Sequence, residues 1–188
     1  MGRILITRHG QTHANQNQIV SGRGDEALTM RGILQVKDLT RILKNYPVEY
    51  IISSPLMRDT QTACICRAEL RVLPSTTMDS LVDRNNGVLE GRPYSEIPRL
   101  AQKYFQAEDG SMYIVEAEGC ETFTQMYERA RVAIRELREE VEEKNIVGDT
   151  LVVCSGLMVR AIYGVEHDVP VEDILKIPKL LIGAYRVL

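Results

Sequence analysis

Apolar and polar positions alternate along this chain in a pattern that predicts strands separated by helices. Apolar runs with the length and composition of buried strands occupy residues 4–9, 48–53 and 150–154. Apolar residues at a spacing of three or four, which is typical of amphipathic helices, occupy residues 29–43, 55–70, 121–144 and 157–163. Because strands and helices alternate, we expect an α/β fold with a largely parallel sheet that helices cover on both faces.

The remaining segments carry weaker patterns. They predict polar loops over 10–27 and 75–98, a short strand over 71–73, a helix over 94–106, an irregular acidic segment over 107–119, a short helix from Pro170 and a last strand over 182–188. The length of 188 residues suits one domain with its own hydrophobic core. We therefore expect a single domain over residues 1–188, with a cap insertion at about 84–120.

Composition limits the classes of partner. The formal net charge of −3 and the pI near 5.7 argue against a nucleic-acid-binding protein, so we expect basic character only in a local pocket. No apolar run approaches the roughly 20 residues that a membrane helix needs, and the first residues lack the pattern of a signal peptide. We expect a cytoplasmic protein with reduced thiols and no membrane contact. A homodimer through an exposed sheet edge stays open.

Residues that could take part in catalysis or anion binding follow the predicted strands. His9 and Arg8 end the first strand, Arg58 follows the second, Ser155 follows the third, and Asp83 lies in a polar loop. Ligands of open α/β sheets bind beyond the carboxyl ends of the strands, so these side chains are expected to share a crevice. Two arginines and an imidazole around one oxyanion predict a phosphate pocket. A neutral His9 could then attack phosphorus, and Asp83 could protonate the leaving oxygen.

The motif at the first strand end resembles that of a known family. Thr7-Arg8-His9-Gly10-Gln11-Thr12, with Asn15, is similar to the signature of the histidine phosphatase superfamily, in its phosphoglycerate mutase-like branch. Further matches follow in order along nearly the whole chain: Leu28-Thr29 with Gly32 and Gln35, Ser53-Ser54-Pro55-Leu56 with Arg58, Gln61-Thr62-Ala63, Leu81 with Asp83, Gly87 with Glu90-Gly91, Gly119 with Glu121, and Gly156 with Arg160. Arg-His-Gly alone is a weak signal, whereas this ordered series is specific.

The resemblance implies a three-layer α/β sandwich in which a histidine is phosphorylated and then hydrolysed. It makes His9 the nucleophile and places Asp83 in the position of the acid. It gives the phosphate-binding role to Arg8 and Arg58, and has Asn15 and Gln11 line the pocket. The family needs no metal, so we expect no metal and no cofactor. The expected ligand is a small-molecule phosphomonoester or a phosphate anion.

Two positions depart from the family pattern. Asp83 stands where the family usually has Glu, which shortens the reach of the acid by one methylene. Ser155 stands at the place of the family's second catalytic histidine. Losing a charged donor to the transition state costs on the order of 10²–10³ in rate. We therefore predict a phosphomonoester hydrolase whose turnover is impaired by Ser155.

Two alternatives remain open at this point. A cofactor-dependent phosphoglycerate mutase is favoured by Arg84, directly after Asp83, but mutases generally have a longer middle insertion and tail than 188 residues allow. A non-catalytic phosphate-binding module is favoured by the missing second histidine. Selectivity is expected to come from residues 84–120, although the helical spacing favours packing roles for their aromatic residues, which are Tyr94, Tyr104, Phe105 and Tyr113.

Overall fold

The computed structural model describes residues 2–73 and 75–188, and its centre is a five-stranded sheet in the order β3-β2-β6-β1-β7. Neighbouring strands are parallel except β7, which is antiparallel to β1. The strands are β1 (Ile4–Arg8), β2 (Val48–Ser53), β3 (Ser75–Thr77), β6 (Asp149–Cys154) and β7 (Tyr185–Val187). The predicted α/β class with a largely parallel sheet is confirmed.

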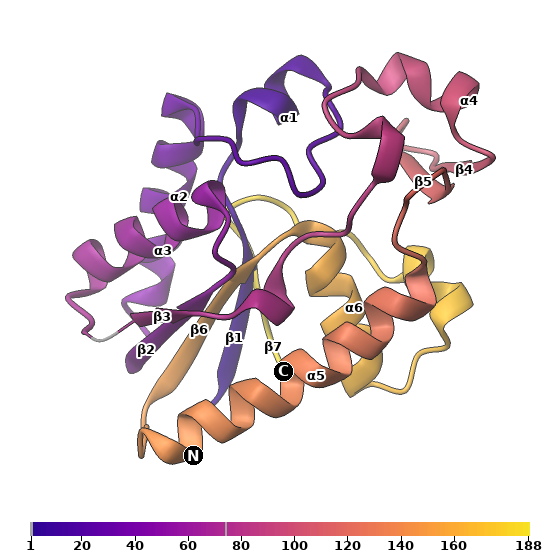
Figure 1. Ribbon diagram of the computed structural model, residues 1–188. Helices are drawn as coiled ribbons and strands as arrows, with labels where there is room; N and C mark the ends of the chain where they lie inside the picture. The colour runs from indigo at the N-terminus through magenta and orange to yellow at the C-terminus, as the bar shows by residue number, and fades with distance from the viewer. Residues whose placement is uncertain (1, 74) are drawn as a thin grey trace.

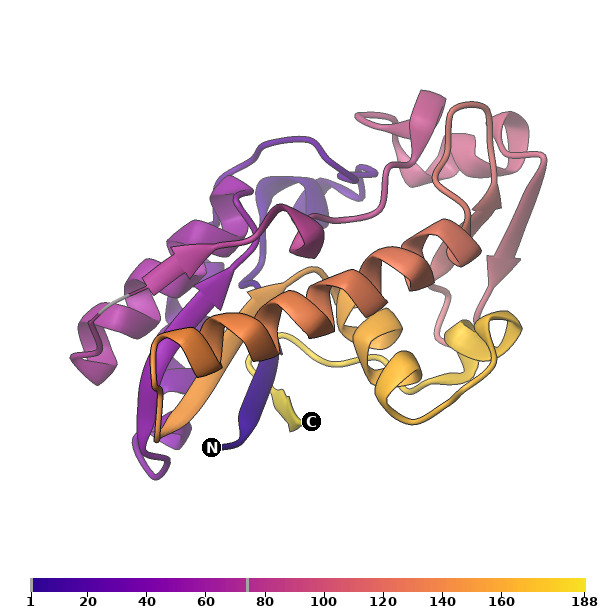
Figure 2. The same ribbon diagram turned by 60° about the horizontal axis from the view of Figure 1, so that its bottom comes forward.

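Helices cover both faces of this sheet, so the molecule has three layers (Figures 1 and 2). α2 (Met30–Leu43) and α3 (Met57–Leu70) pack on one face, whereas α5 (Phe123–Glu143) and α6 (Gly156–Glu166) pack on the other. Successive strand residues point to opposite faces, and in β1 Leu5 meets the first helix pair while Ile6 meets the second. Burial on both faces explains why the strands are continuous apolar runs rather than alternating ones.

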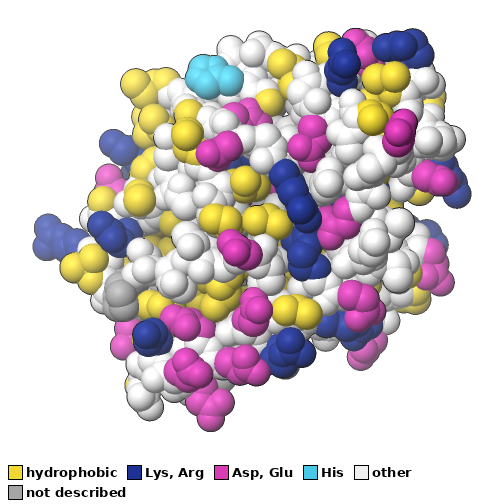
Figure 3. All heavy atoms as spheres, viewed as in Figure 1, with side chains coloured by type: hydrophobic (Ala, Val, Ile, Leu, Met, Phe, Trp, Pro, Cys, Tyr) yellow, Lys and Arg dark blue, Asp and Glu magenta, His cyan; other side chains and the backbone are white. Residues whose placement is uncertain are grey.

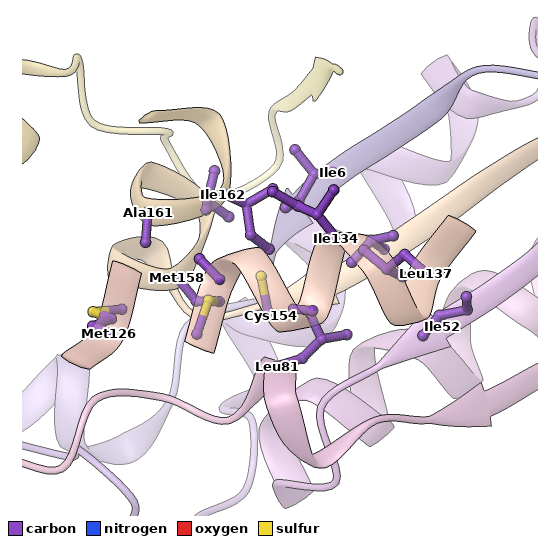
Figure 4. Close-up of a cluster of buried hydrophobic side chains, with 14 of the residues drawn as sticks. Ile6, Ile52, Leu81, Met126, Ile134, Leu137, Cys154, Met158, Ala161 and Ile162 are labelled. Carbon is purple, nitrogen blue, oxygen red and sulfur yellow. The ribbon is translucent and has the colours of Figure 1, made fainter. Parts of the chain in front are cut away.

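Figure 4 shows the larger of these two core layers. Ile6, Ile52 and Cys154 of the sheet lie against Ile134 of α5 and Met158 of α6, all of them buried. Full burial of a side chain of this size contributes about 1.5–3 kcal/mol relative to exposure. The layer therefore fixes α6, which carries site residues, against the carboxyl half of the sheet.

A smaller unit lies beyond the carboxyl edge of the sheet, in the upper right of Figure 1. It contains α4 (Ile97–Leu100) and an antiparallel pair of strands, β4 (Lys103–Gln106) and β5 (Met112–Glu116). A separate apolar cluster holds it together, composed of Val20, Leu89, Ile97, Ile114 and Ala117. Short elements complete the chain: α1 (His13–Asn17) and 3₁₀ turns at Asp79–Leu81, Gly87–Leu89, Tyr94–Glu96 and Val171–Lys176.

The prediction of a helix over 94–106 followed by an irregular segment is wrong. Only Tyr94–Glu96 and Ile97–Leu100 are helical, and the chain then forms the hairpin of β4 and β5. A turn that Gly110 makes possible with φ of +80° connects the strands, and the rings of Phe105 and Tyr113 stack across them at 6.4 Å. This cross-strand pairing stabilises a strand, although the same aromatic residues also fit a helical spacing.

Three smaller predictions also need correction. The short strand over 71–73 is absent, because Arg71 ends α3 in the left-handed conformation and the strand begins at Ser75. The loop over 10–27 contains the short helix α1, which the side chain of Thr12 caps. Pro55 lies before α3 rather than in its first turn, since Leu56 is the N-cap.

α2 packs unusually close to the segment that follows β1. A Cβ on Gly32 of α2 would lie 2.1 Å from the carbonyl oxygen of Gln11, and one on Gly10 would lie 2.5 Å from that of Gly32. The side chain of Thr29 caps the helix by accepting the N–H of Gly32. Glycine at both positions therefore lets α2 hold the backbone next to His9.

The surface carries charges of both signs. On the face drawn in Figure 3, Lys and Arg side chains lie among Asp and Glu side chains, most densely along the lower edge, where α5 runs. Within the part of the chain that the structure describes, no helix is long and apolar enough to cross a membrane.

Candidate active site

His9 lies directly after β1, at the carboxyl edge of the sheet, and is only 3% exposed. Its Nδ1 is 2.7 Å from the carbonyl oxygen of Gly10. Because a carbonyl only accepts, this contact assigns the ring hydrogen to Nδ1 and leaves Nε2 with a free lone pair. Burial, together with the charges of Arg8 and Arg58, holds the pKa of His9 well below its usual range. The ring is therefore neutral, as a nucleophile must be.

A cavity of about 200 Å³ opens beside this ring. Of the seven site residues predicted from the sequence, five line it: Arg8, His9, Asn15, Asp83 and Ser155. They come from segments up to 147 positions apart in the sequence, as the predicted convergence of strand ends requires. The geometry can accommodate a small ligand against Nε2 of His9.

Asp83 and Ser155 are joined directly. The Ser155 hydroxyl donates to Oδ1 of Asp83 at 2.6 Å, and the same oxygen accepts the N–H of Arg84 at 2.8 Å. Oδ2 of Asp83 accepts from Arg58 at 3.2 Å. The Ser155 oxygen also caps α6 by accepting the N–H of Met158. The single hydroxyl hydrogen of Ser155 is thus used by Asp83.

Arg58 and Gln11 lie behind the cavity rather than in its lining. Arg58 is fully buried, and its two terminal nitrogens donate at 2.7 Å to the carbonyl oxygens of Gly22 and Gly24. Gln11 is turned toward α2, where its Oε1 accepts the Thr29 hydroxyl at 2.9 Å. The structure therefore places Arg58 next to Asp83 and near His9, but outside the cavity lining. It does not bring the Gln11 side chain to the cavity.

Asn15 has its amide oriented by the helix that carries it. Its Oδ1 accepts the N–H of Thr12, and its own N–H is bonded to the Thr12 hydroxyl. This reciprocal capping fixes α1 and orients the Asn15 amide at the cavity wall.

Buried guanidinium nitrogens around the cavity lack hydrogen-bond partners among the described residues. They are Nε of Arg8 and Nε and Nη1 of Arg160 in the lining, and Nε of Arg58 outside it. A buried donor without a partner costs about 1–3 kcal/mol, and more when it is charged. An anion bound in the cavity is the chemistry that such donors fit. Gly156 permits this packing, since a Cβ there would lie 3.3 Å from the Arg8 side chain.

Several cavity residues differ from what the sequence indicated. Tyr94 and Tyr113 line the cavity, although the helical spacing favoured packing roles for them. Tyr104 and Phe105 are 41% and 45% exposed and form no part of the lining. Lys179 also lines the cavity, and it follows the last 3₁₀ turn in a segment without any recognisable motif. Only the fold brings it there.

The contacts of Arg84 are with backbone groups of the fold rather than with the cavity. This side chain is fully buried and donates to the carbonyl oxygens of Glu121 at 2.6 Å, of Val115 at 3.1 Å and of Ile114. Its guanidinium lies 4.3 Å above the Phe123 ring. It is not among the residues that line the cavity. Its contacts join β5, in the smaller unit beyond the sheet edge, to the start of α5.

Asp59 is a second buried carboxyl group near the site, and no sequence motif pointed to it. It is fully buried next to Arg58 and accepts a hydrogen bond from the Ser54 hydroxyl. Burial raises its pKa to about 7, against the opposing effect of the Arg58 charge. Within residues 2–73 and 75–188, no three or more His, Cys, Asp or Glu side chains meet in a group that could hold a metal ion.

Comparison with known proteins gives one family. The family model described as histidine phosphatase superfamily (branch 1) matches residues 4–184. The chain is 34% identical over 104 residues to the fructose-2,6-bisphosphatase TIGAR of Xenopus tropicalis, covering 53% of this chain and 38% of that protein. It is 33% identical over 135 residues to the probable phosphoglycerate mutase GpmB of Yersinia pestis (strain Pestoides F), covering 71% and 62%. The matched segments thus span about two fifths to three fifths of these relatives.

The same architecture occurs in a solved structure. Bacillus stearothermophilus YhfR superposes with a TM-score of 0.84 over 100% of this chain and 90% of that chain, at 23% sequence identity. At this identity the likeness concerns the fold.

Proposed function

The chain belongs to branch 1 of the histidine phosphatase superfamily, and from that premise we propose that it hydrolyses small phosphomonoesters through a phosphohistidine at His9. One observation carries the proposal: a neutral imidazole with a free Nε2 borders a cavity whose lining includes Arg8 and Arg160, and both arginines have buried nitrogens without a partner among the described residues. That combination suits a nucleophile facing a tetrahedral dianion.

The reaction has two displacements. Nε2 of His9 attacks phosphorus, the bond between phosphorus and the ester oxygen breaks, and the departing oxygen takes a proton. Water then attacks the phosphohistidine, which releases orthophosphate and restores the neutral ring. Arg8, in the cavity lining, stabilises the phosphoryl oxygens, and Arg58 adds positive charge from outside the lining. Asn15 contributes a hydrogen bond from the cavity wall. The Gly10 carbonyl holds the ring in the reactive tautomer throughout.

Asp83 and Ser155 determine the rate of this cycle. Asp83 is the group placed to protonate the leaving oxygen, and its Oδ1 is shared with the Ser155 hydroxyl. Because the only hydrogen of that hydroxyl points to Asp83, Ser155 contributes no donor to the phosphoryl group. We propose that this lowers turnover on the order of 10²–10³-fold relative to a site with an imidazole donor there.

Covalent labelling tests the intermediate. After incubation with a panel of ³²P-labelled phosphomonoesters, including sugar phosphates, phosphoamino acids and phosphoglycerates, we expect protein-bound label that is stable to base and lost in acid. His9→Ala should abolish it, whereas His167→Ala, at an exposed position outside the cavity, should retain it. Label that survives in His9→Ala would contradict the proposal, and label absent with every substrate would favour a non-catalytic phosphate-binding module.

Replacement of Ser155 tests the impairment. Ser155→His restores an imidazole at the start of α6 and frees Asp83 from the hydroxyl. We expect its steady-state phosphate release to exceed that of the parent by about 10²–10³-fold. Ser155→Ala, which removes the hydroxyl without adding a charged donor, is the matched control. A rate for Ser155→His equal to the parent rate would show that Ser155 does not cause low turnover.

A phosphoglycerate mutase is the second candidate, because a relative that covers 71% of this chain carries the name probable phosphoglycerate mutase. The sequence feature that favoured it, Arg84, is occupied by backbone carbonyl groups outside the cavity. Incubation with one phosphoglycerate isomer separates the two reactions: release of free phosphate supports the hydrolase, and conversion to the other isomer supports the mutase. A homodimer stays a prediction for sedimentation analysis.

A further inference from the structure

The main chain that carries Asp83 is held by side chains rather than by a helix or a strand. Residues 82–85 lie between two 3₁₀ turns and belong to no helix or strand. The carboxylate of Asp83 has partners of its own, which include the Ser155 hydroxyl and Arg58. Those contacts orient the carboxylate, whereas the position of the Asp83 backbone depends on contacts from other parts of the chain.

One guanidinium group binds three carbonyl groups of this segment. Arg129 of α5 donates through Nη1 to the carbonyl oxygens of Ser80 at 3.0 Å and Val82 at 2.5 Å. Its Nη2 donates to the carbonyl oxygen of Asp83 at 3.3 Å. The exposed Arg23 adds one longer contact, at 3.4 Å, to the same oxygen of Asp83. Arg129 itself is not among the residues that line the cavity.

Glu121 fixes the orientation of the Arg129 guanidinium. Its two carboxylate oxygens accept from Nε and Nη2 of Arg129 at 2.9 Å and 2.7 Å. The side chains of Arg129 and Glu121 are only 17% and 11% exposed, so water competes little for this paired contact. The backbone N–H of Glu121 also donates to the carbonyl oxygen of Asn85 at 2.8 Å. The pair therefore holds the segment on both sides of Asp83.

Geometry explains this pair better than stability does. Two largely buried charges carry a desolvation cost that their attraction often only offsets, so apolar residues in their place are frequently neutral for stability. An aspartate side chain is short, and the reach of its carboxyl group follows the position of its backbone. A misplacement of about 1 Å can lower the rate of an enzymatic step by about 100-fold.

We propose that Arg129, held by Glu121, is a positioning residue that sets the reach of the Asp83 carboxyl group to the ester oxygen of the substrate. The role of Asp83, which gives its proton to that oxygen as the bond to phosphorus breaks, rests on the proposed function. Arg129 acts only through the backbone of Asp83. Its loss should weaken this proton transfer and leave the attack by His9 unchanged.

The leaving group of the substrate separates these two effects. 4-Nitrophenolate is a stable anion that departs without a proton, whereas the alkoxide of 2-phenylethanol is strongly basic and needs one. We compare kcat/KM for the phosphate esters of these two alcohols. In Arg129→Met we expect a fall of about 10- to 100-fold for 2-phenylethyl phosphate and a change within about threefold for 4-nitrophenyl phosphate, since positioned acids contribute about 10²–10⁴-fold.

Further variants assign the selective loss to Asp83. Asp83→Asn should show the same selectivity between the two esters, and adding Arg129→Met to it should lower the rates little further, because the acid is already absent. Arg129→Lys keeps the charge and should recover part of the loss. Arg131→Met, in an exposed ion pair with Glu128 on the same helix, is the matched control and should keep both rates. Thermal melting checks folding, and Arg129→Lys decides if Arg129→Met does not fold.

The outcomes separate this inference from the proposed function. An equal fall for both esters in a folded variant, no fall for either, or a full further loss in the Asp83→Asn background overturns the positioning role while the hydrolase stands. A parent protein that hydrolyses only 4-nitrophenyl phosphate also overturns it, and one that hydrolyses neither ester and gives no label at His9 counts against both. A loss confined to 2-phenylethyl phosphate that requires Asp83 supports the inference.

Discussion

A backbone carbonyl, rather than an acidic side chain, determines the state of His9. The Gly10 carbonyl oxygen accepts a hydrogen bond from the Nδ1–H of His9, and burial near positive charges disfavours a second proton on the ring. An acidic partner would stabilise the protonated ring and so oppose nucleophilic attack. Here the arrangement is the opposite: two arginines near the ring lower the pKa of His9 and favour its neutral form, which the proposed nucleophilic role requires.

This arrangement predicts how His9 responds to pH. Free histidine titrates near a pKa of about 6.5, but the ring of His9 should stay neutral as the pH falls from about 8 to about 6. NMR of the imidazole ¹³C–¹H pairs, with the His9 signal identified by its loss in His9→Ala, should show no shift over that range. Because only the unfolded chain gains this proton below about pH 6.5, His9 should also reduce stability as the pH falls further. A His9 signal that moves with a midpoint near 6.5 would contradict the neutral-ring argument.

At the scale of elements, the site depends on how closely α2 approaches the segment after β1. The helix begins with the Thr29 cap, and Gly32 then lies against the backbone of Gln11. The Gly10 N–H is held from the other side by the Thr62 hydroxyl of α3. Two helices thus hold the backbone carbonyl that orients His9.

A methyl group at Gly32 tests this contact. Gly32→Ala would place Cβ 2.1 Å from the Gln11 carbonyl oxygen, so α2 or the segment after β1 must shift. We expect a loss of about 1–3 kcal/mol or more in the free energy of unfolding, measured by urea denaturation. We also expect His9 phosphorylation to slow, because the Gly10 carbonyl moves with its neighbour. Arg31→Ala, exposed on the same helix, is the control and should change neither quantity appreciably.

At the scale of the whole molecule, the cavity is lined from two sides: by the carboxyl edge of the sheet, and by the smaller unit with α4, β4 and β5, which we call the cap. Arg8, His9 and Ser155 come from the sheet edge, while Tyr94 and Tyr113 come from the cap. The cap has its own apolar cluster, which is much smaller than either core layer of the sheet. Its position therefore depends strongly on polar contacts with the domain beneath.

Arg84 supplies the most buried of these contacts, and its replacement should loosen the cap selectively. Arg84→Met leaves the carbonyl oxygens of Ile114, Val115 and Glu121 without their donor. Hydrogen exchange should become faster in β4 and β5 and stay unchanged in β1 and β6. Arg99→Met, in an exposed ion pair with Glu96 of the cap, should leave exchange unaffected. Faster exchange spread evenly over the central strands would instead indicate a global loss of stability.

The sequence alone determined the features that depend on residues close together in the chain. Strand runs buried on both faces, the Thr29 cap and the ordered motifs around His9 were enough for the α/β class and the family, and both are confirmed. The site roles of Asp83 and Ser155 stay predictions, although the structure joins the two side chains. The predicted helix over 94–106 failed because its aromatic residues suit two periods, and only cross-strand pairing selects one of them.

The tertiary structure decided everything that depends on contacts between distant segments. It turned Gln11 away from the cavity, assigned Arg84 to backbone carbonyl groups and brought Lys179 to the cavity wall. It also left Nε and Nη1 of Arg160 buried without an acceptor among the described residues, which no local pattern reveals. The physical reason is that burial and hydrogen-bond satisfaction are properties of packing across the whole chain, whereas periodicity and capping depend on residues a few positions apart.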